Sequence, residues 1–382
     1  MKKSTALLLT ILLILIAVYL FHNGILEINL DKLPGTYNLA PSRQRVQPTP
    51  VQTISTKPTY SYGKTKDLYQ EILDGLTERR DTIWVYDFSI DEIKETILKI
   101  QRDHPEIFWI TQYSYRTHSH ELGVSTEITT TNYEPSKISS KEERLDNVVY
   151  GILNLIPEDA SDYEKLLFIH DFIINTTSYD FSAAQSSDYC DARNAYGCLV
   201  EHKAVCAGYA RAFQLLMNSI GIPCSRVTGS IIGRGTHEWN YVTLDGQDYY
   251  VDVTFDDPVF QGSDDEMCSH AYCCITTAEL NQTHLIDKNQ NAPLCESTAY
   301  DYFRCHNLFI ETYYPYTVVT MVSSAPIGEW VELKFASEEQ CSTAYRELFV
   351  NNGISNYLYW GNVKGCSYGT GSLNTILRVR LY

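Results

Sequence analysis

The chain has 382 residues, which is long enough for two or three compact domains with a sizeable buried core. Hydrophobic residues make up 44% of it and charged residues 20%, a balance typical of globular proteins that excludes wholesale disorder. The net charge of -17, from 30 basic and 47 acidic residues, argues against nucleic acid as a partner.

Residues 1–24 have the pattern of a membrane segment. Lys2 and Lys3 precede an uncharged, mostly apolar run over residues 6–21, just shorter than a usual membrane-spanning helix. Bulky residues follow over 18–22 where a signal peptidase needs small ones, so we expect an uncleaved signal anchor. The lysines would stay inside and the remaining chain would lie outside, at the cell surface. Cleavage, giving a secreted chain, and an apolar core helix are the alternatives.

Residues 25–60 are predicted to form a stalk. The stretch from Pro34 to Tyr60 is rich in Pro, Thr, Gln and Ser and has no periodic apolar pattern. It includes Gln47-Pro48-Thr49-Pro50, which favours an extended, semi-rigid backbone.

Residues 61–138 are predicted to form a small N-terminal α/β domain. Apolar residues recur at helical spacing from Leu68 to Leu76, and a strand is indicated over residues 82–86. Ser89 is positioned to cap a second helix, and strand-like sequence follows over residues 108–131.

A central domain is predicted over residues 139–300 and a C-terminal α/β domain over residues 301–382. In the central domain, apolar periodicity indicates helices over residues 148–156, 163–174 and 204–220. A β-hairpin is expected over residues 236–255, because Asp245-Gly246 between two alternating segments is a strong turn signal. The C-terminal domain has a strand–helix–strand pattern, with the strand over 330–335 and the helix over 338–351.

Cys206 is the candidate nucleophile. It lies in Val205-Cys206-Ala207-Gly208-Tyr209-Ala210, where extended sequence changes to a predicted helix. A thiol at a helix N-terminus faces N–H groups and the positive end of the helix dipole, which favour a thiolate. The same N–H groups can stabilise an oxyanion on an attacked carbonyl. A cysteine alone is weak evidence, since buried free cysteines are common in protein cores.

The predicted hairpin supplies partners for that thiol. A two-residue turn sets Trp239 opposite Asp252 and His237 opposite Thr254, with all four side chains on one face. His237 and Asp252 would then be diagonal neighbours, about 7–8 Å apart at the backbone and within side-chain reach. We therefore predict a catalytic triad of Cys206, His237 and Asp252. A histidine packed beside Trp239 and a solvated Asp252 are the alternative interpretation.

These residues lie in three blocks whose order and spacing resemble the bacterial transglutaminase-like (papain-type cysteine) superfamily. The blocks are Ala195-Tyr196-Gly197 with Val205-Cys206-Ala207-Gly208-Tyr209-Ala210, then Gly235-Thr236-His237-Glu238-Trp239-Asn240, then Tyr250-Val251-Asp252-Val253-Thr254-Phe255-Asp256-Asp257-Pro258. The resemblance covers roughly residues 145–290. It implies an α+β fold with a papain-like transglutaminase core, a helix-borne cysteine and a hairpin-borne histidine and aspartate, flanked by small α/β domains.

The resemblance also implies nucleophilic acyl chemistry on protein or peptide amides. Water would resolve the thioester by proteolysis or deamidation, and an amine would resolve it by cross-linking; the fold does not decide between them. The resemblance places Tyr196 where some relatives have a side chain that stabilises the oxyanion. Trp239 could line the tunnel through which substrate reaches the thioester. For both residues, packing in the core is the alternative. A second hypothesis is a non-catalytic cell-surface binding module with a vestigial triad.

We expect no metal and no cofactor. The segment Cys268-Ser269-His270-Ala271-Tyr272-Cys273-Cys274 contains metal-ligand residue types, but its spacing does not match a paired C-x2-C zinc site. Eleven cysteines are compatible with an oxidising compartment, although spacing alone does not reveal any pairing.

Overall fold

The computed structural model of this chain describes residues 67–121, 123–132, 135–257, 268–288, 290 and 292–382. The predicted signal anchor over residues 1–24 and the predicted stalk over residues 25–60 lie outside these ranges. Within them, no helix combines the length and the apolar character needed to cross a bilayer.

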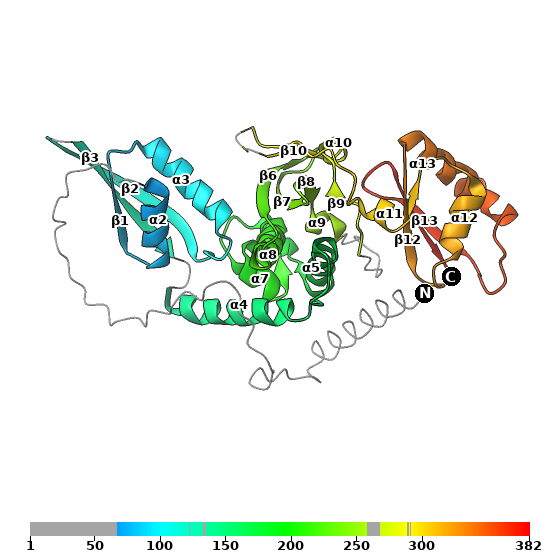
Figure 1. Ribbon diagram of the computed structural model, residues 1–382, viewed down its shortest axis with the longest axis horizontal. Coiled ribbons are helices and arrows are strands. Elements are labelled where there is room, and N and C mark those ends of the chain that lie inside the picture. The colour runs from blue at the N-terminus through cyan, green and yellow to red at the C-terminus, as the bar shows by residue number, and fades with distance from the viewer. Residues whose placement is uncertain (1–66, 122, 133–134, 258–267, 289, 291) are drawn as a thin grey trace. The chain divides into compact units, whose positions relative to one another are not determined.

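The first part of the described chain is a three-stranded antiparallel sheet with two helices (Figure 1). The elements are α2 (Leu68–Thr77), β1 (Thr82–Tyr86), α3 (Ile90–Asp103), β2 (Ile110–His120) and β3 (Gly123–Asn132), with sheet order β1-β3-β2. Ser89 caps α3, as the sequence predicts, and does so through a capping box with Glu92. The apolar faces of both helices are buried in a core that continues into the central region.

The central region places helices against a five-stranded sheet of order β10-β6-β7-β8-β9. Its helices are α4 (Ile138–Leu153), α5 (Asp162–Thr176), α6 (Phe181–Gln185), α7 (Ala195–Leu199), α8 (Cys206–Ser219), α9 (Val253–Asp256) and α10 (Thr277–Leu280). Its strands are β6 (Cys224–Ile231), β7 (Thr236–Leu244), β8 (Gln247–Val251), β9 (Cys273–Ile275) and β10 (His284–Ile286), and β4 (Ser178–Tyr179) pairs separately with β5 (Lys203–Ala204). Helix α8 packs against β6 and β7 (Figure 1).

The predicted hairpin is present and its register is correct near the turn. Asp245 and Gly246 both have positive φ, as a two-residue type I′ turn requires, and Leu244 pairs with Gln247. The predicted extension of the second strand to residue 255 is wrong. Strand β8 ends at Val251, because the Asp252 side chain accepts a hydrogen bond from the Phe255 N–H and caps α9.

That early end also corrects the predicted cross-strand partners. Asp252 is the residue before a helix, so the pairing of β7 with β8 ends at Asn240 and Val251, and Trp239 has a strand partner only on the other side, Val227 of β6. His237 likewise pairs with Gly229, and Thr254, its predicted partner, lies in α9.

The C-terminal region is a four-stranded sheet of order β11-β12-β14-β13 with its own buried core. It comprises α11 (Tyr302–Cys305), β11 (Phe309–Ile310), α12 (Pro315–Ser323), β12 (Trp330–Phe335), α13 (Glu338–Ala344), β13 (Cys366–Thr370) and β14 (Ile376–Leu381). The predicted helix over 338–351 is regular only as far as Ala344 and continues as a π-helical stretch over Tyr345–Val350.

Candidate active site

Cys206 is the first residue of α8. The preceding residue, Val205, is the N-cap in an extended conformation, and its side chain makes no capping hydrogen bond. By contrast, the N-cap of α7, Asn194, accepts hydrogen bonds from the N–H groups of Tyr196 and Gly197. A valine cap leaves the N-terminus of α8 without a side-chain acceptor, so its first N–H groups can serve a bound oxyanion.

His237 and Asp252 are joined by a short hydrogen bond. His237 Nε2 lies 2.6 Å from Asp252 Oδ2, and both side chains are buried. Because Nε2 donates to the carboxylate, Nδ1 is the ring nitrogen left to exchange a proton with the thiol. Cys206 acts on His237 both as a hydrogen-bond partner and as a charge, so the structure brings the three predicted residues together.

Electrostatics favour the charged forms of this pair. Burial opposes a charge on His237, but Asp252 and then Cys206 outweigh it and raise the pKa of His237 to about 10. Burial likewise opposes a charge on Asp252, yet His237 and then His284 hold the pKa of that carboxyl well below its usual range. An imidazolium beside a thiol is the arrangement that stabilises a thiolate nucleophile.

His284 is a site residue that the sequence pattern does not reveal. Its Nε2 lies 2.9 Å from Asp252 Oδ2, so two imidazoles donate to one carboxylate oxygen, and its ring is fully buried. Thr283 Oγ1 lies 2.8 Å from the other ring nitrogen. The only available signal was a histidine in a short apolar segment, 32 residues beyond Asp252. Its relevance depends on β10 pairing with β6, which is a long-range feature.

Two close contacts hold the cysteine-bearing helix in place, one against the histidine-bearing strand and one against the segment that precedes the helix. Asn240 of β7 donates from Nδ2 to the carbonyl oxygen of Ala210 in α8, at 3.0 Å. At Gly208 a Cβ atom would lie 2.5 Å from the carbonyl oxygen of Ala192, so glycine permits the helix to approach the segment before it. The same carbonyl accepts the N–H of Val205 at 2.9 Å, next to the thiol.

The two residues predicted to contact substrate are both buried. The Tyr196 ring stacks on Phe108 with centroids 5.8 Å apart, and its hydroxyl accepts a hydrogen bond from Arg144. Among the described residues, the contacts that fix Tyr196 involve no member of the triad. Trp239 is 1% exposed and stacks on His237 with centroids 5.9 Å apart. Both side chains are packed in the protein interior, and the Trp239 ring lies against the imidazole of His237.

Tyr179 is a second residue that the sequence did not single out. Burial, the charge of Cys206 and the charge of Asp252 raise its pKa to about 12, so its hydroxyl stays protonated at neutral pH. The side chain is half-buried beside the triad and packs edge-on against Phe181. A neutral phenol in this place can donate a hydrogen bond to a bound carbonyl.

Among the residues that the structure describes, two groups of side chains have ligand atoms close enough to hold a metal ion. One is His237, Asp252 and His284, which already form the hydrogen-bonded set described above. The other joins α5 to the segment before β9 and consists of four residues, His170, Asp171, Cys268 and His270. All eleven cysteines have free thiols.

Comparison with known proteins finds similarity in the central region. A family model described as the transglutaminase-like superfamily matches residues 154–254, a range that contains Cys206, His237 and Asp252. The kyphoscoliosis peptidases of Mus musculus and Homo sapiens are similar over 118 residues, at 31% and 30% identity respectively. Each alignment covers 27% of this chain and 17% of the relative, so the chain matches less than a fifth of either relative's length.

A solved structure described as a TGase is also similar, at 15% identity over 49% of this chain and 53% of that chain. Its TM-score of 0.28 is too low to carry an argument about the whole chain. The family match and the mixed helix-and-sheet architecture agree with each other. Residues 154–254 are therefore similar to the transglutaminase-like superfamily and lie within a mixed helix-and-sheet fold.

Proposed function

We propose that this chain is a thiol-dependent acyl-transfer enzyme that acts on protein or peptide amides through Cys206, His237 and Asp252. The observation that carries the proposal is the 2.6 Å hydrogen bond between buried His237 and Asp252, with Cys206 beside the imidazole. These three residues lie inside the match to the transglutaminase-like family. A triad that had lost its activity would not require the Asp252 carboxylate to be held ionised by two buried imidazoles, those of His237 and His284.

In the first half of the reaction, Cys206 Sγ attacks the carbonyl carbon of the amide. A carbon–sulfur bond forms, and the carbonyl oxygen becomes an oxyanion at the N-terminus of α8, where the N–H groups of Cys206 and Ala207 begin the helix. His237 then donates the proton on Nδ1 to the leaving amine as the carbon–nitrogen bond breaks. The product is a thioester on Cys206, and Asp252 keeps the ring oriented throughout.

In the second half, His237 Nδ1 accepts a proton from the nucleophile that attacks the thioester. Water gives hydrolysis, seen as deamidation or chain cleavage, and a primary amine gives a new amide, seen as a cross-link. In both cases the carbon–sulfur bond breaks and Cys206 leaves with the electron pair. The enzyme class is therefore an amide hydrolase or a transglutaminase-like acyltransferase.

The proposed place of action is outside the cell membrane, at the cell surface. This part of the proposal rests on the two lysines and the apolar run within residues 1–24, together with the polar stretch that follows them. An extracytoplasmic enzyme anchored in this way would meet protein and peptide substrates at the surface.

An activated ester tests the chemistry without knowledge of the natural substrate. We expect p-nitrophenyl acetate to acylate the purified full chain in a rapid burst, with the acetyl group found on Cys206 by peptide mass spectrometry. Cys206→Ala should abolish the burst, whereas Cys305→Ser, at an exposed cysteine, should retain it. Adding a primary amine during deacylation separates amide formation from hydrolysis. Equal slow acylation of wild type and Cys206→Ala would contradict the proposal and favour a non-catalytic binding module.

A further inference from the structure

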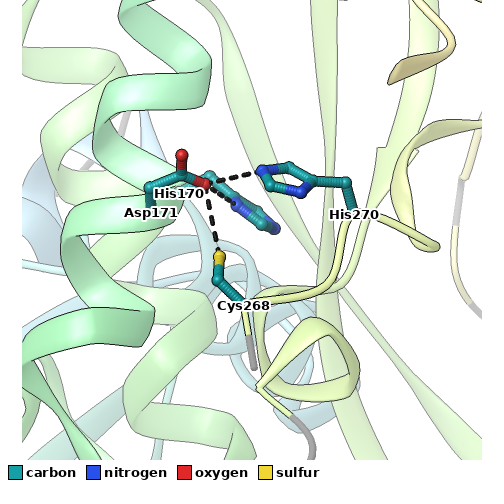
Figure 2. A group of neighbouring side chains, drawn as sticks. All are labelled: His170, Asp171, Cys268 and His270. Carbon is teal, nitrogen blue, oxygen red and sulfur yellow. Dashed lines mark hydrogen bonds and ion pairs between the residues drawn. The ribbon is translucent and has the colours of Figure 1, made fainter. Parts of the chain in front are cut away.

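Four side chains outside the triad converge on a single point, although they come from two distant parts of the chain. Figure 2 shows His170 and Asp171 from α5 facing Cys268 and His270 from the segment that leads into β9. Three contacts meet at one oxygen, Asp171 Oδ1: His170 Nδ1 at 2.9 Å, His270 Nε2 at 2.8 Å and Cys268 Sγ at 3.5 Å. All four potential ligand atoms lie within 4.8 Å of one another.

The donor set matches the chemistry of zinc. Two imidazole nitrogens, one thiolate sulfur and one carboxylate oxygen are all common zinc ligands, and four of them complete a tetrahedral shell. A thiolate together with a carboxylate also neutralises the charge of a divalent cation. The thiolate disfavours the hard cations Mg²⁺ and Ca²⁺, which select oxygen ligands.

The surroundings of the two imidazoles are those of metal ligands. His170 presents Nδ1 to the cluster, while its Nε2 lies 3.1 Å from the buried carboxylate of Asp256. A carboxylate on the second nitrogen is the usual way in which a protein orients a metal-binding histidine. His270 is held by a parallel stack on Tyr302, with ring centroids 3.7 Å apart and an angle of 5° between the planes.

Burial makes this a structural site rather than a catalytic one. His170 is fully buried and the side chain of His270 is 11% exposed, whereas the side chain of Asp171 is 42% exposed and gives an ion a way in. With four protein ligands there is no open position for water or substrate, which is the mark of a structural zinc site.

We propose that His170, Asp171, Cys268 and His270 bind one zinc ion that fastens α5 to the segment before β9. The anchored segment is connected to the active site by two backbone contacts of Tyr272. Its N–H donates to the Asp256 carboxylate at 2.9 Å, and its carbonyl accepts the N–H of Asp252 at 3.1 Å. The ion would thus hold in place the backbone that carries the triad aspartate.

Metal analysis of the full chain, purified without chelators, tests the proposal. We expect about one equivalent of zinc per chain. After the zinc is removed and Co²⁺ is added, we expect the visible bands of tetrahedral cobalt together with a thiolate-to-cobalt charge-transfer band. Less than stoichiometric zinc in wild type, combined with no cobalt–thiolate band on titration, would overturn the proposal. This readout does not depend on catalysis or on any variant folding.

Matched variants test which residues bind the ion. Cys268→Ser and Asp171→Asn should weaken Co²⁺ binding by at least about 100-fold, because loss of a ligand exceeds the cost of losing an orienting partner. Cys305→Ser removes an exposed thiol outside the cluster and should leave binding unchanged. His284→Gln alters the other group of potential ligands and should also leave it unchanged. Loss of binding in His284→Gln with retention in Cys268→Ser would overturn the assignment.

Discussion

His284 donates a hydrogen bond to the same carboxylate oxygen of Asp252 that accepts one from the proposed general base, His237. The 2.9 Å contact shares Oδ2 with His237, so two buried imidazoles hold one oxygen of the aspartate while its other oxygen caps α9. The carboxylate therefore has little freedom to rotate away from His237. We infer that His284 is a positioning residue for the triad.

The first prediction concerns the imidazole of His284. His284→Ala removes a hydrogen bond to a charged group, which contributes about 1.5–3 kcal/mol. We expect burst acylation of Cys206 to slow about 10- to 100-fold. His284→Gln, whose amide can donate to Asp252, should recover part of the rate. If His284 had a purely structural role, both variants would lose thermal stability to the same extent, and the pH profile of acylation would not change.

The second prediction concerns Gly208, where α8 lies close to the backbone of Ala192. In Gly208→Ala the new Cβ would lie 2.5 Å from the Ala192 carbonyl oxygen, a backbone atom that cannot move without shifting the N-terminus of α8. We expect a loss of stability of about 1–3 kcal/mol and slower modification of Cys206. The matched change Gly151→Ala lies within α4, where no atom is within 4 Å of the new Cβ.

Gly151→Ala should instead stabilise the chain by about 0.5–1 kcal/mol, because alanine is the better helix former. Urea denaturation measures both variants. Equal effects of the two substitutions would contradict the close approach at Gly208.

The third prediction concerns a buried lysine in the C-terminal sheet. Lys334 of β12 is 3% exposed and forms ion pairs with Asp301 and, at 2.5 Å, with Glu279 of α10. Lys334→Ala leaves two carboxylates without their shared cation, so we expect the free energy of unfolding to fall by about 3–5 kcal/mol.

A surface pair provides the control for that measurement. Lys99 pairs with Asp103 one helical turn away on α3, and its side chain is 55% exposed. Lys99→Ala should cost about 0.3–0.5 kcal/mol in urea denaturation. A comparable cost at both lysines would contradict the role of Lys334 as a buried partner of two carboxylates.

The fourth prediction is a pH dependence of stability. The pKa of His237 is raised in the folded chain to about 10 from an ordinary value of 6.5. A raised pKa means that the stabilisation is fully present below about pH 6.5 and is lost as the pH rises through about 10. Urea denaturation of wild type and His237→Gln should therefore show a stability difference that shrinks over this range. A difference independent of pH would contradict the charged His237–Asp252 pair.

Local patterns in the sequence predicted much of the architecture. The helix cap at Ser89, the strand over 82–86 and the turn at Asp245-Gly246 all depend on neighbours within a few residues, and all are present. The end of β8 was missed because Asp252 both follows an alternating strand pattern and is a good helix N-cap. The alternation suggested that the strand continued, whereas the side-chain cap ends it.

Contacts between distant segments account for what the sequence could not show. His284 reaches Asp252 only because β10 is added to the far edge of the sheet beside β6. The cluster around Asp171 joins residues separated by 97 positions, so no spacing rule applied to Cys268 and its neighbours could reveal it. Pairing rules predict neighbouring strands well, but they do not predict the order of strands in a sheet.

The most direct test of the account is the rate at which a small alkylating reagent modifies Cys206 in the full chain, measured across pH. We predict rapid modification below neutral pH in wild type, because an imidazolium on His237 stabilises the thiolate. The fast phase at low pH should disappear in His237→Ala and persist in Cys305→Ser. A Cys206 that remains unreactive below neutral pH, or reacts equally fast in His237→Ala, would contradict the proposed triad.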